Sequence, residues 1–358
     1  MSNPTISLPF TTLDLERNRP QSGWFASSRL RNRVAVITSS ILALFLFFRY
    51  WNHAVHRTSN HSTASTLQPL SPIYEGVEIS DQLAGVTHLI VLAGHAIWLG
   101  GQSYLQDKDW ILEPYQHGQT ALFAAHIVRG AELLAQDASA LLVFSGGETR
   151  AGAGSRTEAQ SYAQLLDLLM SEGKVAGVPA TEPGQVFSTE ASSLQFRATT
   201  ENFARDSFDN LLFSLCRFYE VTGRYPTKVS VVGYQFKADR FHNLHRAALK
   251  YPETAFVYVG LDQDDPAVAA LTGHPIDKTT LSMQSQDNVD KARPQFERDL
   301  YACHDPELTQ KKKHRNPARR RHGYELSNPL LKPLLEFCPS KAATSLDAQL
   351  YPAKLPWS

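Results

Sequence analysis

The sequence predicts an α/β protein with a doubly wound, mainly parallel sheet of about five strands, preceded by one N-terminal transmembrane helix. Short apolar runs, which are typical of strands buried on both faces, alternate along the chain with longer segments of helical periodicity. This alternation favours a parallel sheet with helices on both faces, because parallel strands need crossover connections. A charge-free apolar stretch near the N-terminus predicts the membrane helix.

The membrane helix is predicted from residues 34–48, VAVITSSILALFLFF, which contain no charged side chain. A helix of this length covers only about 22 Å, but an arginine on each side can snorkel, and Tyr50 and Trp51 suit the membrane interface. A buried core helix is the alternative. Arginine is more frequent before the stretch than after it, so we expect a single-pass signal anchor with a cytosolic N-terminus. The main domain would then be lumenal or extracellular, in the endoplasmic reticulum or Golgi or at the plasma membrane.

Composition and periodicity divide the chain into five predicted segments. They are a disordered cytosolic tail (1–33), the signal anchor (34–51), a stem (52–80), an α/β core (81–262) and a C-terminal extension that packs on the core and is partly irregular (263–358). Strands are predicted at 87–94, 140–147, 229–234 and 255–261, and more weakly at 185–189. Helices are predicted at 117–136, 156–172, 199–222 and 237–250. This order is Rossmann-like, and ligands of such sheets bind beyond the carboxyl ends of the strands.

The first predicted strand ends in Gly94, and His95 follows it. Glycine lets backbone N–H groups approach a ligand closely, and the histidine is a candidate acid, base or ligand-binding group. A loop histidine held by ordinary hydrogen bonds is the alternative for His95.

The second strand ends in Ser145, Gly146 and Gly147, and a glycine-rich loop then leads to Arg156 and Glu158 at the start of a helix. The loop is not a Walker A motif, because it lacks the Lys-Ser/Thr pair that binds phosphate and magnesium. A helix N-terminus beside an arginine is a plausible anion site, whereas Glu158 favours a hydroxyl-rich or cationic group. Simple helix capping explains the same residues equally well.

The later strand ends are polar as well. Glu201 and Asn202 follow Thr199 and Thr200, of which either threonine could cap the next helix. After the fourth strand, Lys237 and Arg240 gather positive charge at a helix start, where the helix dipole disfavours cations. A bound anion would offset this unfavourable placement.

Composition narrows the classes of partner. The chain has 35 Lys and Arg against 35 Asp and Glu, so bulk charge gives no indication of a nucleic-acid partner. Its cysteines, Cys216, Cys303 and Cys338, are too scattered for a zinc site, although one disulfide is possible; no metal site is predicted. Seven of the eleven residues 311–321 are Lys or Arg, which indicates a solvated loop or, as the alternative, a nuclear-import or anionic-surface patch.

Four motifs occur in the order that is typical of domain-of-unknown-function family 218, which includes the bacterial YdcF-like and SanA-like proteins: AGHAIWLGG, SGG followed by RTEAQSY, ATTENFARDS and VGYQFKADRFHNLHRAAL. The chain resembles the fungal branch of this family over about residues 87–335, including RNPARRRHGYELSNPLL near the C-terminus. The resemblance implies a Rossmann-like fold tethered by one membrane helix and a nucleotide-like ligand such as S-adenosylmethionine. It places the site at Gly94, Ser145, Gly146, Gly147, Glu158, Glu201, Asn202 and Arg240. The bacterial proteins have a Tyr-His pair where this chain has Gln235-Phe236-Lys237, so proton transfer would fall to His95.

Together these observations predict a membrane-anchored protein that binds or acts on a small anionic or nucleotide-like ligand. If it is an enzyme, a transferase or hydrolase is expected, with His95, Glu158 and Glu201 as catalytic groups. The ligand-binding groups would be Gly94, Ser145, Gly146, Gly147, Arg156, Asn202, Lys237 and Arg240. The alternative is a non-catalytic envelope or secretory-pathway maintenance factor that acts through a protein partner.

Overall fold

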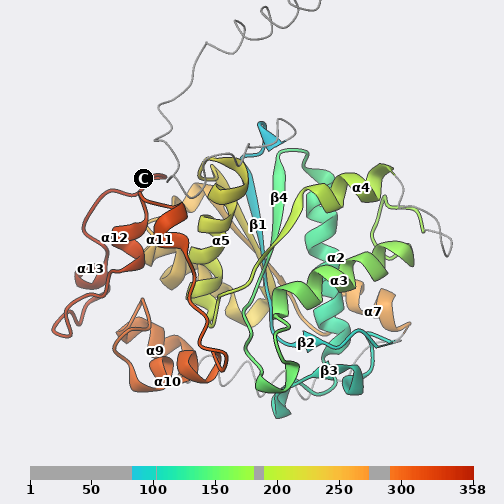
Figure 1. Cartoon of the computed structure of the whole chain (residues 1–358), viewed down its shortest axis with the longest axis horizontal. Coiled ribbons are helices and arrows are strands. Elements are labelled where there is room, and N and C mark those ends of the chain that lie inside the picture. The colour runs from blue at the N-terminus through green and yellow to red at the C-terminus, as the bar shows by residue number, and fades with distance from the viewer. Residues whose placement is uncertain (1–82, 102, 181–188, 274–290) are drawn as a thin grey trace, which may run out of the picture. The chain divides into compact units, whose positions relative to one another are not determined.

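Five parallel strands form the central sheet (Figure 1). They are β1 (His88–Ala93), β4 (Ala140–Ser145), β5 (Ala198–Glu201), β6 (Lys228–Tyr234) and β7 (Phe256–Leu261), in the spatial order β5-β4-β1-β6-β7. A short antiparallel pair, β2 (Ile97–Trp98) and β3 (Trp110–Ile111), lies beside the sheet's carboxyl edge. The predicted α/β class and five-stranded parallel sheet are confirmed, and the arrangement is consistent with a Rossmann-like fold.

This computed structural model describes residues 83–101, 103–180, 189–273 and 291–358. The predicted tail, signal anchor and stem lie outside these ranges. Within the described ranges, no helix combines the length and the apolar character that crossing a membrane requires.

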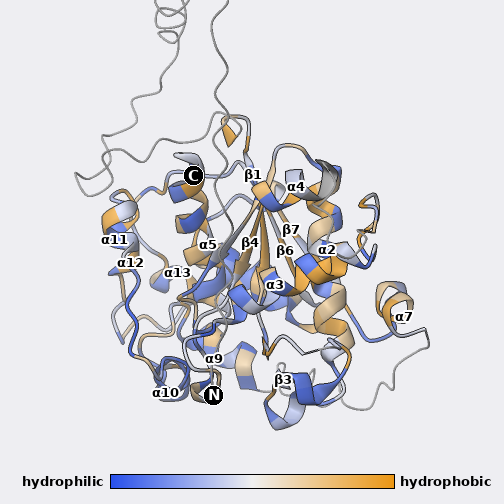
Figure 2. Cartoon of the chain, turned by 45° about the vertical axis from the view of Figure 1, so that its right-hand side comes forward, coloured by the Kyte–Doolittle hydropathy of each residue, from blue (hydrophilic) through white to orange (hydrophobic). Residues whose placement is uncertain are grey.

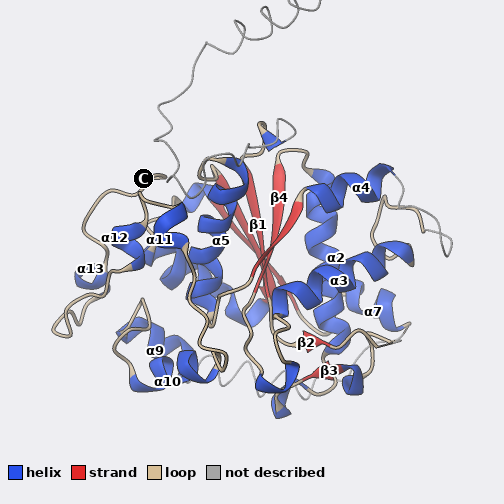
Figure 3. Ribbon diagram, viewed as in Figure 1, coloured by secondary structure: helices blue, strands red, loops and turns tan. Residues whose placement is uncertain are grey.

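Helices cover both faces of the sheet (Figure 3). The α-helices are α2 (Thr120–Gln136), α3 (Glu158–Ser171), α4 (Thr189–Phe196), α5 (Ser207–Thr222), α6 (Arg246–Ala248), α7 (Pro266–Thr272), α9 (Arg293–Arg298), α10 (Pro306–His314), α11 (Tyr324–Ser327), α12 (Lys332–Leu335) and α13 (Leu346–Gln349). Short 3₁₀ turns occur at η3 (Asp107–Asp109), η4 (Pro114–Gln116), η5 (Ala151–Ala153), η6 (Gln235–Lys237) and η8 (Glu253–Ala255), and η7 (Arg240–His245) is a π-helix.

The central strands are mostly apolar because both of their faces are buried (Figure 2). In β1, Ile90 and Leu92 pack with α2 and α3 on one face, whereas Leu89 and Val91 pack with α5 on the other. The second face also receives the C-terminal extension, whose apolar side chains belong to the same cluster. They include Phe296, Leu300, Leu308, Tyr324 and Leu331.

One predicted helix starts at the wrong residue, and most of one predicted strand lies outside the described residues. The strand beside β4 is β5, Ala198–Glu201, which overlaps the predicted start of the helix at 199–222. Of the predicted weak strand at 185–189, the structure describes only Thr189, which begins α4. The long helix starts at Ser207 and is capped by Asp206, not by a threonine. The strand was missed because β5 is an edge strand whose first three residues are only half-buried, so it lacks a continuous apolar run.

The C-terminal extension contains a disulfide between Cys303 and Cys338. Three cysteines allow one disulfide, and this is the pair that forms it. Cys216 is free and buried in α5. The disulfide joins the segment before α10 to the segment after α12, and it therefore ties together two parts of the extension that are 35 residues apart in sequence.

Candidate functional site

A cavity of about 360 Å³ opens at the carboxyl edge of the sheet. It lies where β1 and β6 are neighbours, which is the point at which the chain changes its direction of progress across the sheet. Ligands of open α/β sheets bind at such a point because the loops diverge there. Gly94 and His95 line the cavity after β1, Lys237 and Arg240 line it after β6, and the start of α5 closes one wall.

The side chains of His95 and Lys237 are in contact in the cavity lining. The Nζ atom of Lys237 lies 3.4 Å from Nδ1 of His95 and 4.7 Å from the centre of the Tyr234 ring. Burial lowers the pKa of His95 well below its usual value, and the charge of Lys237 lowers it further. The other ring nitrogen, Nε2, is buried and has no hydrogen-bond partner among the described residues. This geometry makes His95 a support for Lys237, with its remaining nitrogen turned away from solvent.

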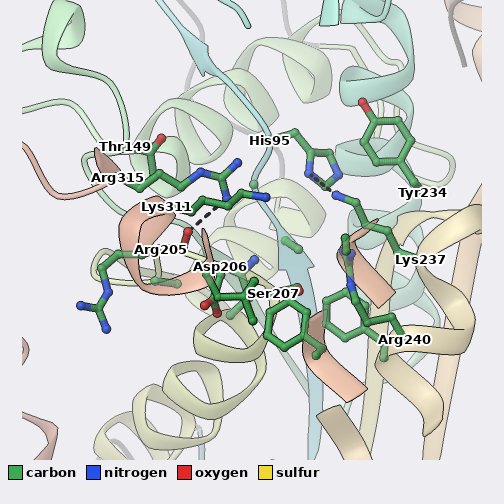
Figure 4. Close-up of a pocket in the computed structure, with 18 of the residues that line it drawn as sticks. His95, Thr149, Arg205, Asp206, Ser207, Tyr234, Lys237, Arg240, Lys311 and Arg315 are labelled. Atoms are coloured by element: carbon green, nitrogen blue, oxygen red, sulfur yellow. Dashed lines mark hydrogen bonds between the residues drawn. The ribbon is translucent and has the colours of Figure 1, made fainter. Parts of the chain in front are cut away.

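Cations from the C-terminal extension enter the same cavity. In Figure 4, Lys311 and Arg315 extend into it from one side, and Lys237 extends from the other. The charge of Arg315, followed by burial and the charge of Arg240, lowers the pKa of Lys311 to about 7. The pKa of Lys237 is lowered by burial and then by Arg240, Arg315 and Lys311. These cations are therefore close enough to repel one another.

The carboxylates that line the cavity bond to groups other than Lys237, Lys311 and Arg315. Asp206 caps α5 by accepting a hydrogen bond from the Asp209 backbone, and it forms an ion pair with Lys312 at 3.2 Å. Glu158 accepts a hydrogen bond from the Thr149 hydroxyl and lies 4.0 Å from the Arg150 guanidinium. The charge of Lys237, Lys311 and Arg315 is thus left without a carboxylate partner among the described residues.

The glycine-rich loop after β4 is filled by a side chain of the protein itself. A Cβ atom on Gly94 or on Gly146 would lie 2.7 Å from the Cβ atom of Glu158. Only glycine at both positions lets the first residue of α3 lie between the ends of β1 and β4. The backbone N–H of Glu158 also bonds the Gly147 carbonyl at 3.1 Å. The loop is therefore a tight strand-to-helix turn. The side chain of Glu158 fills the space beside Gly94 and Gly146 in which a phosphate-binding loop would hold its phosphate.

Three further predicted ligand-binding residues hold this turn in place and do not line the cavity. The Asn202 side chain accepts a hydrogen bond at 2.7 Å from Thr157, the residue that caps α3. Arg156 donates to the Trp98 carbonyl at 3.3 Å. Gly147 donates its N–H to the Ala204 carbonyl at 2.8 Å. The capping interpretation of these residues matches their contacts.

Ser145 and Glu201 form a buried polar pair at the ends of β4 and β5. The Ser145 hydroxyl donates to Glu201 at 2.7 Å, and the carboxyl group also accepts from the Phe203 and Ala204 backbone and from the Tyr324 hydroxyl. Burial raises the pKa of Glu201 to about 7. Neither residue lines the cavity, so their position fits a structural role in joining β5 to the turn after it.

The chain is similar to a yeast protein. It is 33% identical over 269 residues to the uncharacterized protein YOR238W of Saccharomyces cerevisiae. The matched region covers 66% of this chain and 86% of the yeast protein. This chain belongs to the YOR238W family. No protein-family model matches the chain, and no solved structure matches it.

Sequence reasoning missed four residues of this family member's cavity region. Lys311 and Arg315 were interpreted only as part of the basic run at 311–321, as a solvated loop or a surface patch, although Lys312 in that run is paired with buried carboxylates. Ser207 lines the cavity, and its hydroxyl bonds His245 at 2.8 Å. The one available signal in the sequence was the density of Lys and Arg at 311–321. So many neighbouring cations favour an anionic partner, although the charge of the whole chain is balanced.

Proposed function

We propose that the cavity binds a small ligand carrying phosphate and that the protein acts on this ligand as an enzyme. The observation that carries the proposal is the group of Lys237, Lys311 and Arg315, which extend into one cavity and have no carboxylate partner among the described residues. Mutual repulsion of cations destabilises the empty site, and a polyanion would remove that cost. A protein that acted only through a surface partner would not need this concentration of charge at a sheet edge.

The charge also discriminates between nucleotide-like ligands. S-adenosylmethionine carries a sulfonium and an ammonium group against a single carboxylate, so its net charge is positive. A cavity that already contains a surplus of cations favours a phosphorylated compound over such a ligand. We therefore place phosphate esters, including nucleotides, ahead of S-adenosylmethionine as the ligand class.

Calorimetric titration of the full-length protein with sulfate at about pH 6 and about pH 8 tests this proposal. Sulfate keeps its double charge across this range, whereas phosphate titrates. The ammonium of Lys311 faces Arg315, Arg240, Arg150, Asp206 and Lys237, and its pKa is about 7. Because Lys311 is protonated at the lower pH, binding should be about fivefold to tenfold tighter there.

Phosphate, adenosine monophosphate, adenosine and S-adenosylmethionine form the comparison panel. Phosphate and the nucleotide should bind, and adenosine should not. Equal sulfate affinity at both pH values would contradict the role of Lys311. No binding by any anion would redirect the search to a protein partner, in line with a maintenance factor of the secretory pathway.

We also propose that residues 34–51 anchor the protein in a membrane, with the α/β domain on the lumenal or extracellular side. The apolar stretch and the distribution of arginine support this, and so does the Cys303–Cys338 disulfide, since such bonds persist in oxidising compartments. In sealed microsomes, protease should leave the α/β domain intact until detergent is added. Digestion without detergent would contradict this topology.

A further inference from the structure

Ser207 and His245 form a hydrogen-bonded pair at the cavity. Ser207 is the first residue of α5, and its Oγ atom lies 2.8 Å from Nε2 of His245. Figure 4 shows Ser207 beside Asp206, on the wall that faces Lys237 and Arg240. The N-cap of α5 is already supplied by Asp206, so the serine hydroxyl is not needed to cap the helix.

The fold holds the histidine of this pair rigidly. His245 is fully buried, and its ring packs against Phe241 and Phe296 at centroid distances of 5.1 and 4.6 Å. It lies on the π-helix η7, whose hydrogen bonds join residues five apart. Arg240 and His245 are therefore one turn apart and both buried. Nδ1 of His245 has no hydrogen-bond partner among the described residues, and burial lowers the pKa of this histidine well below its usual value. A neutral imidazole is the form that can accept a proton.

The groups around Ser207 and His245 suit the transfer of a phosphoryl group. Arg240 lies close enough to influence the titration of His245, and Lys237 and Lys311 extend into the same cavity. The first N–H groups of α5 have no acceptor within the helix, and its positive dipole end also points at this wall. Cations and N–H donors of this kind stabilise the equatorial oxygens of a transferring phosphoryl group.

We propose that Ser207 is a nucleophile, and His245 its general base, in the hydrolysis of a phosphate monoester bound in the cavity. This inference rests on the proposed function. The Ser207 Oγ atom attacks phosphorus while its proton passes to Nε2 of His245. The bond from phosphorus to the alcohol oxygen breaks, and the alcohol leaves with that proton. Water then attacks the phosphoserine and gives a proton to His245. The Oγ–phosphorus bond breaks, inorganic phosphate leaves, and the proton returns to Ser207.

The chemistry favours a phosphoryl over an acyl group. An acyl transfer needs donors for one developing oxyanion, and surplus cations add little to it. A phosphate monoester brings two negative charges to a cavity that has several cations without carboxylate partners among the described residues. The pair therefore fits the ligand class that the cavity itself favours.

The test compares full-length wild-type protein with Ser207→Ala, using p-nitrophenyl phosphate as the probe. Ser214→Ala is the matched control, because Ser214 lies on the same helix, is buried, and does not line the cavity. Wild type and the control should release p-nitrophenol, and the Ser207 variant should be slower by about 100-fold or more. Acid-quenched wild type, digested and analysed by mass spectrometry, should carry a phosphoryl group on the peptide that contains Ser207.

Sulfate titration of the same proteins separates the two proposals. If Ser207→Ala binds sulfate like wild type but has lost turnover, both proposals are supported, and a folding defect is excluded. If wild type binds sulfate but neither turns over the probe nor acquires the phosphoryl group, the nucleophile is overturned and the anion site stands. Unchanged turnover in Ser207→Ala also overturns the nucleophile. If wild type does not bind sulfate, the proposed function fails, and this inference fails with it.

Discussion

A Lys311→Ala, Arg315→Ala double variant is expected to bind sulfate at least about 100-fold more weakly than wild type at about pH 6. Each charge-assisted hydrogen bond contributes about 1.5–3 kcal/mol, and about 1.4 kcal/mol corresponds to a tenfold change in affinity. Both side chains extend into the cavity, so one anion can contact both. Titration calorimetry measures the loss. Lys332→Ala, Lys341→Ala is the control, because these lysines are exposed and outside the cavity.

The same variant separates a binding role from a structural one. The pKa of Lys311 is about 7 in the folded protein and 10.5 as its ordinary value, so the unfolded chain binds more protons between these limits. Protonation of Lys311 therefore favours unfolding. The contribution of Lys311 to the free energy of unfolding rises as pH rises from about 7 to 10.5. We expect the ligand-free variant to melt at the same temperature as wild type or higher at about pH 6. A clear loss of thermal stability would identify these cations as structural.

Glu201→Ala is expected to lower the free energy of unfolding by about 3 kcal/mol or more. The substitution leaves the N–H groups of Phe203 and Ala204 and the Tyr324 hydroxyl without this acceptor, and each such loss costs about 1–3 kcal/mol. Urea unfolding measures the change. Glu132→Ala removes a carboxylate paired with Arg129 on the surface of α2 and should cost no more than about 1 kcal/mol.

The titration of Glu201 gives this prediction a pH signature. Its pKa is raised from 4.5 to about 7, so between these values the unfolded chain has released a proton that the folded protein retains. The contribution of Glu201 to stability therefore falls as pH rises through this window. Wild type should lose more stability than Glu201→Ala between about pH 4.5 and about pH 7. Parallel pH profiles would show that this carboxyl group does not titrate as its burial implies.

The fold class could be predicted from the sequence because burial on both faces leaves a direct trace in it. β1, β4 and β6 are buried over nearly their whole length and appear as continuous apolar runs. β5 is short, half-buried and at the sheet edge, so its threonines were interpreted as the start of a helix. Hydrophobic periodicity reports burial, and an edge strand with little burial gives no such signal.

The site could be predicted in part because strand ends of a parallel sheet converge. Gly94, His95, Glu158, Lys237 and Arg240 all line the cavity. Ser145, Glu201 and Asn202 lie at the same edge, but their polar atoms bond neighbouring turns. Position along the chain places a residue at the edge, whereas its hydrogen-bond partners decide whether it faces a ligand or the protein.

The sequence by itself determined the α/β class, the approximate order of strands and helices, and the edge of the sheet where polar groups gather. Only the tertiary structure brought Lys311 and Arg315 to that edge, more than 70 residues after Arg240, and paired Ser207 with His245. The reason is physical. Local periodicity records which residues are buried, but the charge balance of a cavity depends on contacts between segments that are distant in the chain.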